Sequence, residues 1–226
     1  MDRAATLTRM TVEPLDDGRK RLTPPLTDEE VEAFDAGDVV LVKGTVIGAR
    51  DAAHKRLVEM LERGEELPFD PRGAVIYYVG PTPERPGNPI GAAGPTTAGR
   101  MDRYTPALLE QGVKAMIGKG GRGPAIRAEL QRHTAVSLAA LGGGGALAAR
   151  AITRQRVIAF EDLGPEAIRE IEMDDFPVWV VNDCRGRDYY AETILPWRKD
   201  ELLPVELRAA GREIGPSQER GELGGG

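Results

Sequence analysis

The chain has 226 residues, of which 41% are hydrophobic and 5% aromatic, so it can fold as one domain with a sizeable core. Its 30 basic and 36 acidic residues give a net charge of −6, which argues against nucleic acid as the main partner. Cys184 is the single cysteine, so an internal disulfide is excluded and the chain alone cannot supply the several thiolates of an iron–sulfur cluster or structural zinc site.

The N-terminal region is polar. Residues 1–10 lack the apolar core of a signal peptide, and no apolar run in the chain approaches the length of a membrane span. We therefore expect a cytoplasmic protein without a membrane partner. Residues 1–24, with a turn signal at residues 16–18, predict an N-terminal arm or an edge hairpin.

Regular elements are predicted from residue 25 onward. Thr27, followed three residues later by Glu30, has the spacing of a capping box and predicts the start of a helix. Residues 39–50 are rich in β-branched side chains and interrupted by Gly44, which favours a buried strand or a hairpin. Asp51 can cap the following helix, which we expect to end at Gly64.

The remaining elements alternate. Strands are predicted at residues 74–81, 113–118, 135–141, 156–163 and 175–183, and helices at residues 104–111, 124–133, 146–152 and 165–173. This alternation predicts an α/β domain over residues 25–200 with a largely buried sheet. Charge and glycine dominate residues 201–226, so we expect a polar, disordered tail there.

The stretch Gly91–Asp102, GAAGPTTAGRMD, has the composition of an anion-binding loop. Its small residues let a ligand approach the backbone closely, and glycine tolerates the tight dihedral angles of such a turn. Thr96 and Thr97 offer hydroxyls as donors, acceptors or proton-transfer groups, and Arg100 can grip a carboxylate with two parallel hydrogen bonds.

Other charged groups follow predicted strands, where ligands of α/β proteins collect. Arg50 and Lys119 occupy such positions, and together with Arg100 they suggest a site for a small dianion. Arg50 could equally form an ion pair with Asp51 or another carboxylate. Lys119, taken alone, is more typical of a solvated turn lysine.

Two further features have alternative readings. His54 follows Arg50 by four residues on one helix face and could support it by hydrogen bonding. Gly142–Gly145 resembles a phosphate-binding loop, but no Lys-Ser/Thr pair follows it, so close packing of a helix on a sheet is favoured. His133 is interpreted as a surface residue, and Cys184 as incidental.

The chain resembles the C-terminal domain, or separate β subunit, of the class I iron–sulfur fumarate hydratases and the related L(+)-tartrate dehydratases. The resemblance lies in GDVVLVKGTVIGARDAAHKRL, LPFDPRGAVIYYVGPTP, GAAGPTTAGRMD, the turn at Lys119 and AFEDLGPEAIREIEMDDFPVWVVND. These stretches cover about residues 25–190, and their order and combination are specific.

The resemblance implies a swivelling β/β/α fold that docks against an α domain or subunit. That partner would hold a 4Fe-4S cluster on three cysteines, with one open iron acting as a Lewis acid. By motif, Arg50, Arg100 and Lys119 would hold the substrate carboxylates, and Thr96 would be the base for proton transfer at C3. Asp51, His54 and Thr97 would lie next to these residues and hold them in position without binding the substrate. No metal ligand is expected in this chain.

The resemblance therefore predicts the β subunit of a two-subunit hydro-lyase that interconverts fumarate and (S)-malate, in an assembly of the α2β2 type. Dehydration of L(+)-tartrate and hydration of mesaconate are alternatives that differ by one substituent of the substrate. A non-catalytic dicarboxylate-binding or regulatory module is an alternative of another class. The presence of Thr96 beside both Arg100 and Lys119 argues against it.

Overall fold

The computed structural model describes residues 11–194 and Trp197. Residues 1–10 of the predicted arm and the whole predicted tail, residues 201–226, lie outside this part of the chain. Strands β1 (Val12–Pro14) and β2 (Lys20–Leu22) form an antiparallel hairpin, as expected for this region. Because β2 also pairs in parallel with β3, the hairpin extends one edge of the main sheet.

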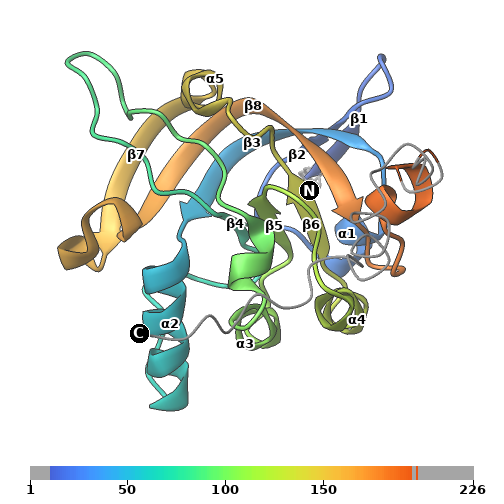
Figure 1. Cartoon of the computed structure of the whole chain (residues 1–226), viewed down its shortest axis with the longest axis horizontal. Coiled ribbons are helices and arrows are strands. Elements are labelled where there is room, and N and C mark those ends of the chain that lie inside the picture. The colour runs from blue at the N-terminus through green and yellow to red at the C-terminus, as the bar shows by residue number, and fades with distance from the viewer. Residues whose placement is uncertain (1–10, 195–196, 198–226) are drawn as a thin grey trace, which may run out of the picture.

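Five strands close into a barrel-like sheet: β3 (Val39–Gly48), β4 (Val75–Tyr77), β5 (Ala115–Gly118), β6 (Val136–Ala139) and β8 (Ile168–Asn182). The first four are parallel neighbours, and β8 runs antiparallel to both β6 and β3, which closes the ring (Figure 1). Strand β7 (Ile152–Ala159) pairs with β8 outside it. The predicted α/β class is confirmed as a mixed fold built on a sheet, whereas the swivelling arrangement stays a prediction.

The helices are short. They are α1 (Asp28–Glu32), α2 (Asp51–Glu62), α3 (Thr105–Glu110), α4 (Pro124–Arg132) and α5 (Gly145–Arg150). Two 3₁₀ segments, Ala98–Met101 and Glu161–Glu166, and a π-helical turn, Tyr190–Ile194, complete the regular structure of the described residues. In Figure 1, α2, α3 and α4 lie side by side below β4, β5 and β6.

The alternation of side chains along the barrel strands produces two hydrophobic cores. In β4, Val75 and Tyr77 belong to the inner cluster, which fills the barrel. Ile76, between them, belongs to the outer cluster, which lies between the barrel and the helices. The inner cluster also contains Val40, Val42, Ile117, Leu138, Val178 and Val180. The outer cluster contains Ala53, Leu57, Met101, Leu108, Ile126 and Leu130. The helices thus fix the outer face of the strands whose ends carry the candidate site.

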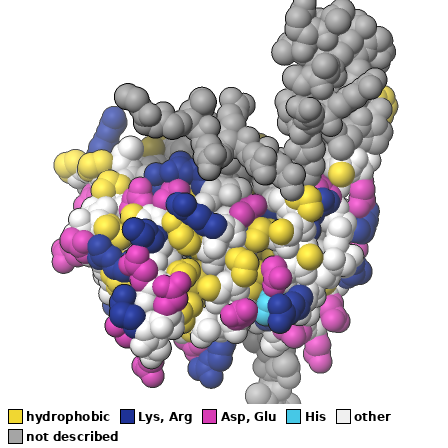
Figure 2. All heavy atoms as spheres, turned by 60° about the horizontal axis from the view of Figure 1, so that its bottom comes forward, with side chains coloured by type: hydrophobic (Ala, Val, Ile, Leu, Met, Phe, Trp, Pro, Cys, Tyr) yellow, Lys and Arg dark blue, Asp and Glu magenta, His cyan; other side chains and the backbone are white. Residues whose placement is uncertain are grey.

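Figure 2 shows the molecule with this lower, helical side turned forward. Basic and acidic side chains are interspersed over the visible face, with hydrophobic side chains between them. Such a mixture of both signs is typical of a solvated surface. Within the described residues, no helix is long and apolar enough to cross a bilayer.

Several local predictions are confirmed. Thr27 caps α1 with both hydrogen bonds of a capping box, since its hydroxyl accepts from the Glu30 N–H and the Glu30 carboxylate accepts from the Thr27 N–H. Gly44 lies within one continuous strand, with φ of +100°, at a shift in the β3–β8 register. It is therefore a bulge rather than the turn of a hairpin.

The helix predicted at residues 165–173 is wrong. A 3₁₀ turn ends at Glu166, and β8 begins at Ile168 between β3 and β7. The charged side chains that suggested a helix instead pair across strands: Arg156 Nε donates to Glu170, and Thr45 Oγ1 donates to Glu172. These cross-strand contacts come from distant segments, so local spacing could not reveal them.

Candidate functional site at the ends of three parallel strands

The candidate site is built where β3, β4 and β5 end, because adjacent parallel strands deliver their following residues to the same edge. Arg50 follows β3, Tyr78 follows β4 and Lys119 follows β5. The loop that carries Thr96 returns to this edge, where the Thr96 N–H donates to the Tyr78 carbonyl at 2.7 Å.

Backbone hydrogen bonds also join the Thr96 loop to the Lys119 turn. The Lys119 N–H donates to the Thr96 carbonyl at 3.0 Å, and the Ala98 N–H donates to the Lys119 carbonyl at 2.9 Å. Gly118 permits this closure, since a Cβ there would lie 2.9 Å from the Tyr78 ring and 3.1 Å from the Thr96 carbonyl oxygen. Thr96 and Lys119 are therefore neighbours through the main chain.

Arg50 and Arg100 meet at a shared carboxylate. Asp51 accepts from Arg50 Nε at 3.3 Å and from Arg100 Nε at 2.9 Å. Glu166 lies 3.1 Å from Arg50 Nη2 and also accepts from the Ala52 N–H. We call these four side chains, Arg50, Asp51, Arg100 and Glu166, the strand-end cluster. The alternative reading of Arg50 as an ion-pair partner is thus realised in the structure.

The expected capping role of Asp51 is wrong. Asp51 is the first residue of α2, and the N-cap position belongs to Arg50, which makes no side-chain capping hydrogen bond. Glu166 instead accepts from the Ala52 N–H in the first turn of α2, which has no acceptor within the helix. The sequence reasoning missed Glu166, which is separated from Ala52 by 114 positions and lies where a helix was expected.

Both arginines keep donors that could serve a ligand. Arg100 uses its Nε towards Asp51, and its side chain is 52% exposed, whereas that of Arg50 is 25% exposed. Within the described residues, no ion pair engages the terminal nitrogens of Arg100. A bound carboxylate could therefore take two parallel hydrogen bonds from Arg100 without displacing Asp51.

The two threonines differ in access. Thr96 is buried, with 8% of its surface exposed, and Thr97 is exposed. Lys119 is exposed, and its side chain passes over Gly142, whose added Cβ would lie 3.6 Å from Lys119 Cδ. Among residues 11–194 and Trp197, no carboxylate forms an ion pair with Lys119. Its ammonium is available to an anion.

A pocket of about 580 Å³ opens beside Lys119. Thr97 and Lys119 supply its polar lining, and its apolar walls include Leu141, Trp179 and Tyr189. The structure therefore brings the loop of Thr96, Thr97 and Arg100 and the turn of Lys119 to one edge, where Thr97 and Lys119 line the cavity but Thr96 and Arg100 do not. Arg50 joins them through Asp51.

His54 is completely buried behind this edge. Its Nδ1 lies 3.0 Å from the Arg50 carbonyl oxygen, and its ring meets Tyr78 edge-on at a centroid distance of 5.2 Å. Burial lowers the pKa of His54 to about 4, so the ring is neutral at neutral pH. His54 contacts the backbone of Arg50 and not its guanidinium, so it fixes the start of α2.

Gly142–Gly145 packs against the Gly91–Asp102 loop. The Ala93 N–H donates to the Gly145 carbonyl at 2.9 Å, and a Cβ on Gly145 would lie 3.1 Å from the Gly94 nitrogen. Small residues on both sides permit this contact. Close packing is thus present, but these contacts join the start of α5 to a loop and not to the sheet.

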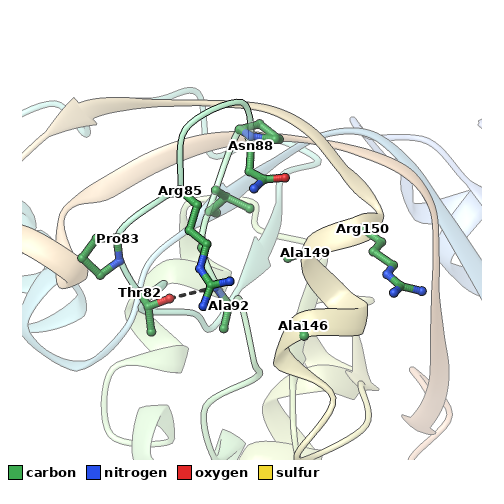
Figure 3. Close-up of a pocket in the computed structure, with 11 residues that line it drawn as sticks. Thr82, Pro83, Arg85, Asn88, Ala92, Ala146, Ala149 and Arg150 are labelled. Carbon is green, nitrogen blue, oxygen red and sulfur yellow. Dashed lines mark hydrogen bonds between the residues drawn. The ribbon is translucent and has the colours of Figure 1, made fainter.

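A second pocket, of about 400 Å³, lies between the proline-rich loop after β4 and α5 (Figure 3). Arg85 comes from the loop and Arg150 from α5, and Thr82 accepts a hydrogen bond from the Ala92 N–H. None of the predicted site residues lines this pocket. It is separate from the strand-end site.

Cys184 is half-buried, and burial raises the pKa of its thiol. Within the part of the chain that the structure describes, no three His, Cys, Asp or Glu side chains gather in a way that could hold a metal ion. A lone thiol that resists ionisation is a poor cluster ligand, so this donor set does not fit an iron–sulfur cluster.

A protein-family model described as "Fumarase C-terminus" matches residues 4–193, most of the chain. The chain belongs to this family. Fumarate hydratase 2 of Leishmania major is 36% identical over 168 residues, covering 74% of the chain and 30% of that protein. The anaerobic class I fumarate hydratase of Escherichia coli is 39% identical over 153 residues, covering 67% and 28%.

The chain is also similar to a protein much shorter than these fumarate hydratases. The putative L(+)-tartrate dehydratase subunit beta of Methanocaldococcus jannaschii is 35% identical over 173 residues, covering 74% of the chain and 89% of that subunit. The chain thus spans less than a third of the two fumarate hydratases but corresponds to nearly the whole β subunit. The resemblance to this family is confirmed. The roles of individual residues stay predictions.

Proposed function

We propose that this chain is the β subunit of a two-subunit hydro-lyase that adds water reversibly to fumarate to give (S)-malate. The observation that carries the proposal is the meeting of Thr96 with Arg100, Lys119 and the strand-end cluster at one edge of the barrel. Membership of the fumarase C-terminus family supports the reaction class.

In this proposal the cations hold the two carboxylates of the substrate. Among the described residues no ion pair engages the terminal nitrogens of Arg100, whose planar geometry suits one carboxylate, and Lys119 provides a point charge for the other. Arg50 lies on the far side of Asp51 and adds positive charge to the same edge. Binding through both ends fixes the carbon–carbon double bond beside the loop that carries Thr96.

Thr96 is the proposed proton-transfer residue. In the hydration direction, hydroxide from water bonds to one alkene carbon, the other carbon, C3 of the product, receives a proton from the Thr96 hydroxyl, and the proton lost by water restores that hydroxyl. In the dehydration direction, Thr96 Oγ1 takes that proton back as the hydroxyl group leaves. A threonine hydroxyl is a weak acid and base, so neighbouring cations must stabilise its alkoxide. Lys119 is joined to Thr96 by a backbone hydrogen bond, and Arg100 follows Thr96 by four residues on the same loop.

The groups that activate the leaving hydroxyl are proposed to lie on another chain. Because the donor set described above does not fit a cluster, we propose a cysteine-bearing α subunit that holds a 4Fe-4S cluster. When bound, such a cluster supplies Lewis-acid chemistry. We propose a cytoplasmic assembly of the α2β2 type.

Dehydration of L(+)-tartrate to oxaloacetate is a second candidate. The near-complete coverage of a tartrate dehydratase β subunit, against less than a third of each fumarate hydratase, favours it. Tartrate differs from malate by one hydroxyl, so a few polar contacts in the pocket would decide between them.

Co-expression with a cysteine-bearing α chain and purification without oxygen test the proposal. We expect a complex that hydrates fumarate and loses activity in air, while either chain alone is inactive. Parallel assays with fumarate and L(+)-tartrate separate the two candidates. An iron-free preparation of this chain that hydrates fumarate unaided would contradict the two-subunit proposal.

A further inference from the structure

Arg122 is the largest fully buried side chain in the described part of the molecule, and the proposed chemistry does not use it. A buried guanidinium is costly unless its donors are satisfied. Its Nε donates to Asp102 Oδ1 at 2.6 Å, its Nη1 donates to the Tyr78 hydroxyl at 3.2 Å, and its Nη2 donates to the Thr105 hydroxyl. We call Arg122 and these three partners the buried arginine network.

The partners of Arg122 come from the segments that build the candidate site. Asp102 ends the Gly91–Asp102 loop, Thr105 begins α3, and Tyr78 is the residue whose carbonyl accepts the Thr96 N–H. Asp102 also accepts from the Gly123 N–H through its second oxygen, at 3.1 Å. Arg122 itself follows Lys119 by three residues. The buried guanidinium of Arg122 therefore connects the loop that carries Thr96 to the turn that carries Lys119, from the interior side of both segments.

The geometry explains why arginine is needed here. The three acceptors lie on different segments, and a planar guanidinium can reach them simultaneously with fixed N–H directions. Lysine would carry the charge but has one ammonium, which cannot span the same three positions. Burial acts to lower the pKa of Arg122, but the neighbouring Tyr78 and Asp102 more than offset it and the pKa is raised, so the guanidinium stays charged.

We propose that Arg122 is a positioning residue for the site, one that holds the Thr96–Arg100 loop and Lys119 in register with each other. It has no exposed surface, so it acts through Asp102, Tyr78 and Thr105 without touching a substrate. The proposal rests on the proposed function for its catalytic consequence. Its structural consequence, the locking of two loops, can be measured without any reaction.

Hydrogen exchange of the full-length chain tests the locking. The reporters are the N–H groups of Ala98 and Lys119, which bond across the two loops. In Arg122→Lys we expect these two to exchange at least about tenfold faster, while amides in β3 and β8 change only as global stability changes. Arg21→Lys is the matched control, since Arg21, in strand β2 of the hairpin, donates two hydrogen bonds to Asp175. It should leave both reporters at their wild-type rates.

Tyr78→Phe removes a single acceptor of Arg122 and keeps the ring, so it remains informative if Arg122→Lys fails to fold. It should accelerate the same two reporters by a smaller factor. Unchanged exchange at Ala98 and Lys119 in whichever variant folds would overturn the proposal. Acceleration shared equally by β3 and β8 would overturn it too, because the effect would then be global.

Steady-state kinetics of the active complex with an α chain test whether Arg122→Lys also disturbs the candidate site. Misplaced clamps raise KM and lower kcat together, whereas simple loss of folded enzyme lowers the apparent kcat at unchanged KM. We expect both parameters to worsen in Arg122→Lys, by about tenfold or more in kcat/KM. An inactive wild-type complex would count against the proposed function, while the exchange result would still decide the role of Arg122.

Discussion

Two clusters of side chains built around arginine lie close together in this molecule, and their arginines differ in access to solvent. In the strand-end cluster, Arg100 pairs with Asp51 and is half exposed. In the buried arginine network, Arg122 pairs with Asp102 and has no exposed surface. Both pairs are arginine–carboxylate contacts under 3 Å. The two pairs differ in the burial of the arginine, and this difference gives them different roles.

An exposed arginine can add or exchange a carboxylate partner at little cost, because water compensates both ions. A buried arginine cannot, since removing its partner leaves an unpaired charge in a low-dielectric interior. The strand-end cluster therefore suits reversible anion binding, and the buried network suits the fixing of loops. The following variants are arranged from the largest expected effect to the smallest.

Removal of the carboxylate that pairs with the buried Arg122 should have the largest effect on stability. Asp102→Ala leaves Arg122 without its charged partner, so we expect the free energy of unfolding to fall by about 3–5 kcal/mol. Urea denaturation measures the change. A loss below about 1 kcal/mol is the size expected for an exposed ion pair. It would show that the two arginine–carboxylate pairs contribute equally to the free energy of unfolding, and it would contradict the difference proposed between them.

The buried His54 should make stability depend on pH. Its pKa is lowered from 6.5 to about 4 by burial, so between these values the unfolded chain binds a proton that the folded chain excludes. The stabilisation is complete above pH 6.5 and is lost as the pH falls towards 4, by up to about 3 kcal/mol. Denaturation of wild type and His54→Phe across this range measures it. An unchanged slope in His54→Phe would show that other groups cause the loss.

Arg100→Gln tests the exposed group as a ligand clamp. We expect kcat/KM of the complex for its dicarboxylate substrate to fall about 100-fold, since one charge-assisted carboxylate contact is lost, with little change in unfolding temperature. Arg103→Gln is the control, because Arg103 is exposed three residues further on and stacks on the Tyr104 ring. Equal losses in both variants would argue against a specific clamp.

Asp51→Ala should have the smallest effect on stability. It removes the carboxylate shared by Arg50 and Arg100. Because the pairs are partly exposed, we expect a loss of about 1 kcal/mol or less, reduced further by added salt. Urea denaturation at low and high ionic strength measures both. A loss as large as that of Asp102→Ala would remove the distinction between the two groups.

The sequence predicted those features that depend on local pattern. The capping box at Thr27 and Glu30 and the strand ending before Lys119 are both present. Each follows from side chains a few positions apart. The meeting of Arg50, Thr96, Arg100 and Lys119 at one edge follows from parallel strand order, which the alternation of elements implied.

The features that the sequence did not predict depend on distant contacts. Glu166 reaches the start of α2 across 114 positions, and the charged start of β8 is held between two other strands. Arg122 lies in a glycine-rich stretch of the sequence, which is typical of a surface turn. Its side chain is nevertheless fully buried, because Asp102, Tyr78 and Thr105 surround it. Local spacing carries no information about such partners.

The most direct test of the central claim is the turnover of fumarate by the complex with its α chain when the Thr96 hydroxyl is removed. Thr96→Ala is compared with Thr153→Ala, which removes an exposed hydroxyl from β7. We expect kcat to fall by about 10²–10⁴ in Thr96→Ala, the range for loss of a general acid–base group, and to stay at the wild-type value in Thr153→Ala. Wild-type turnover in Thr96→Ala would contradict the account.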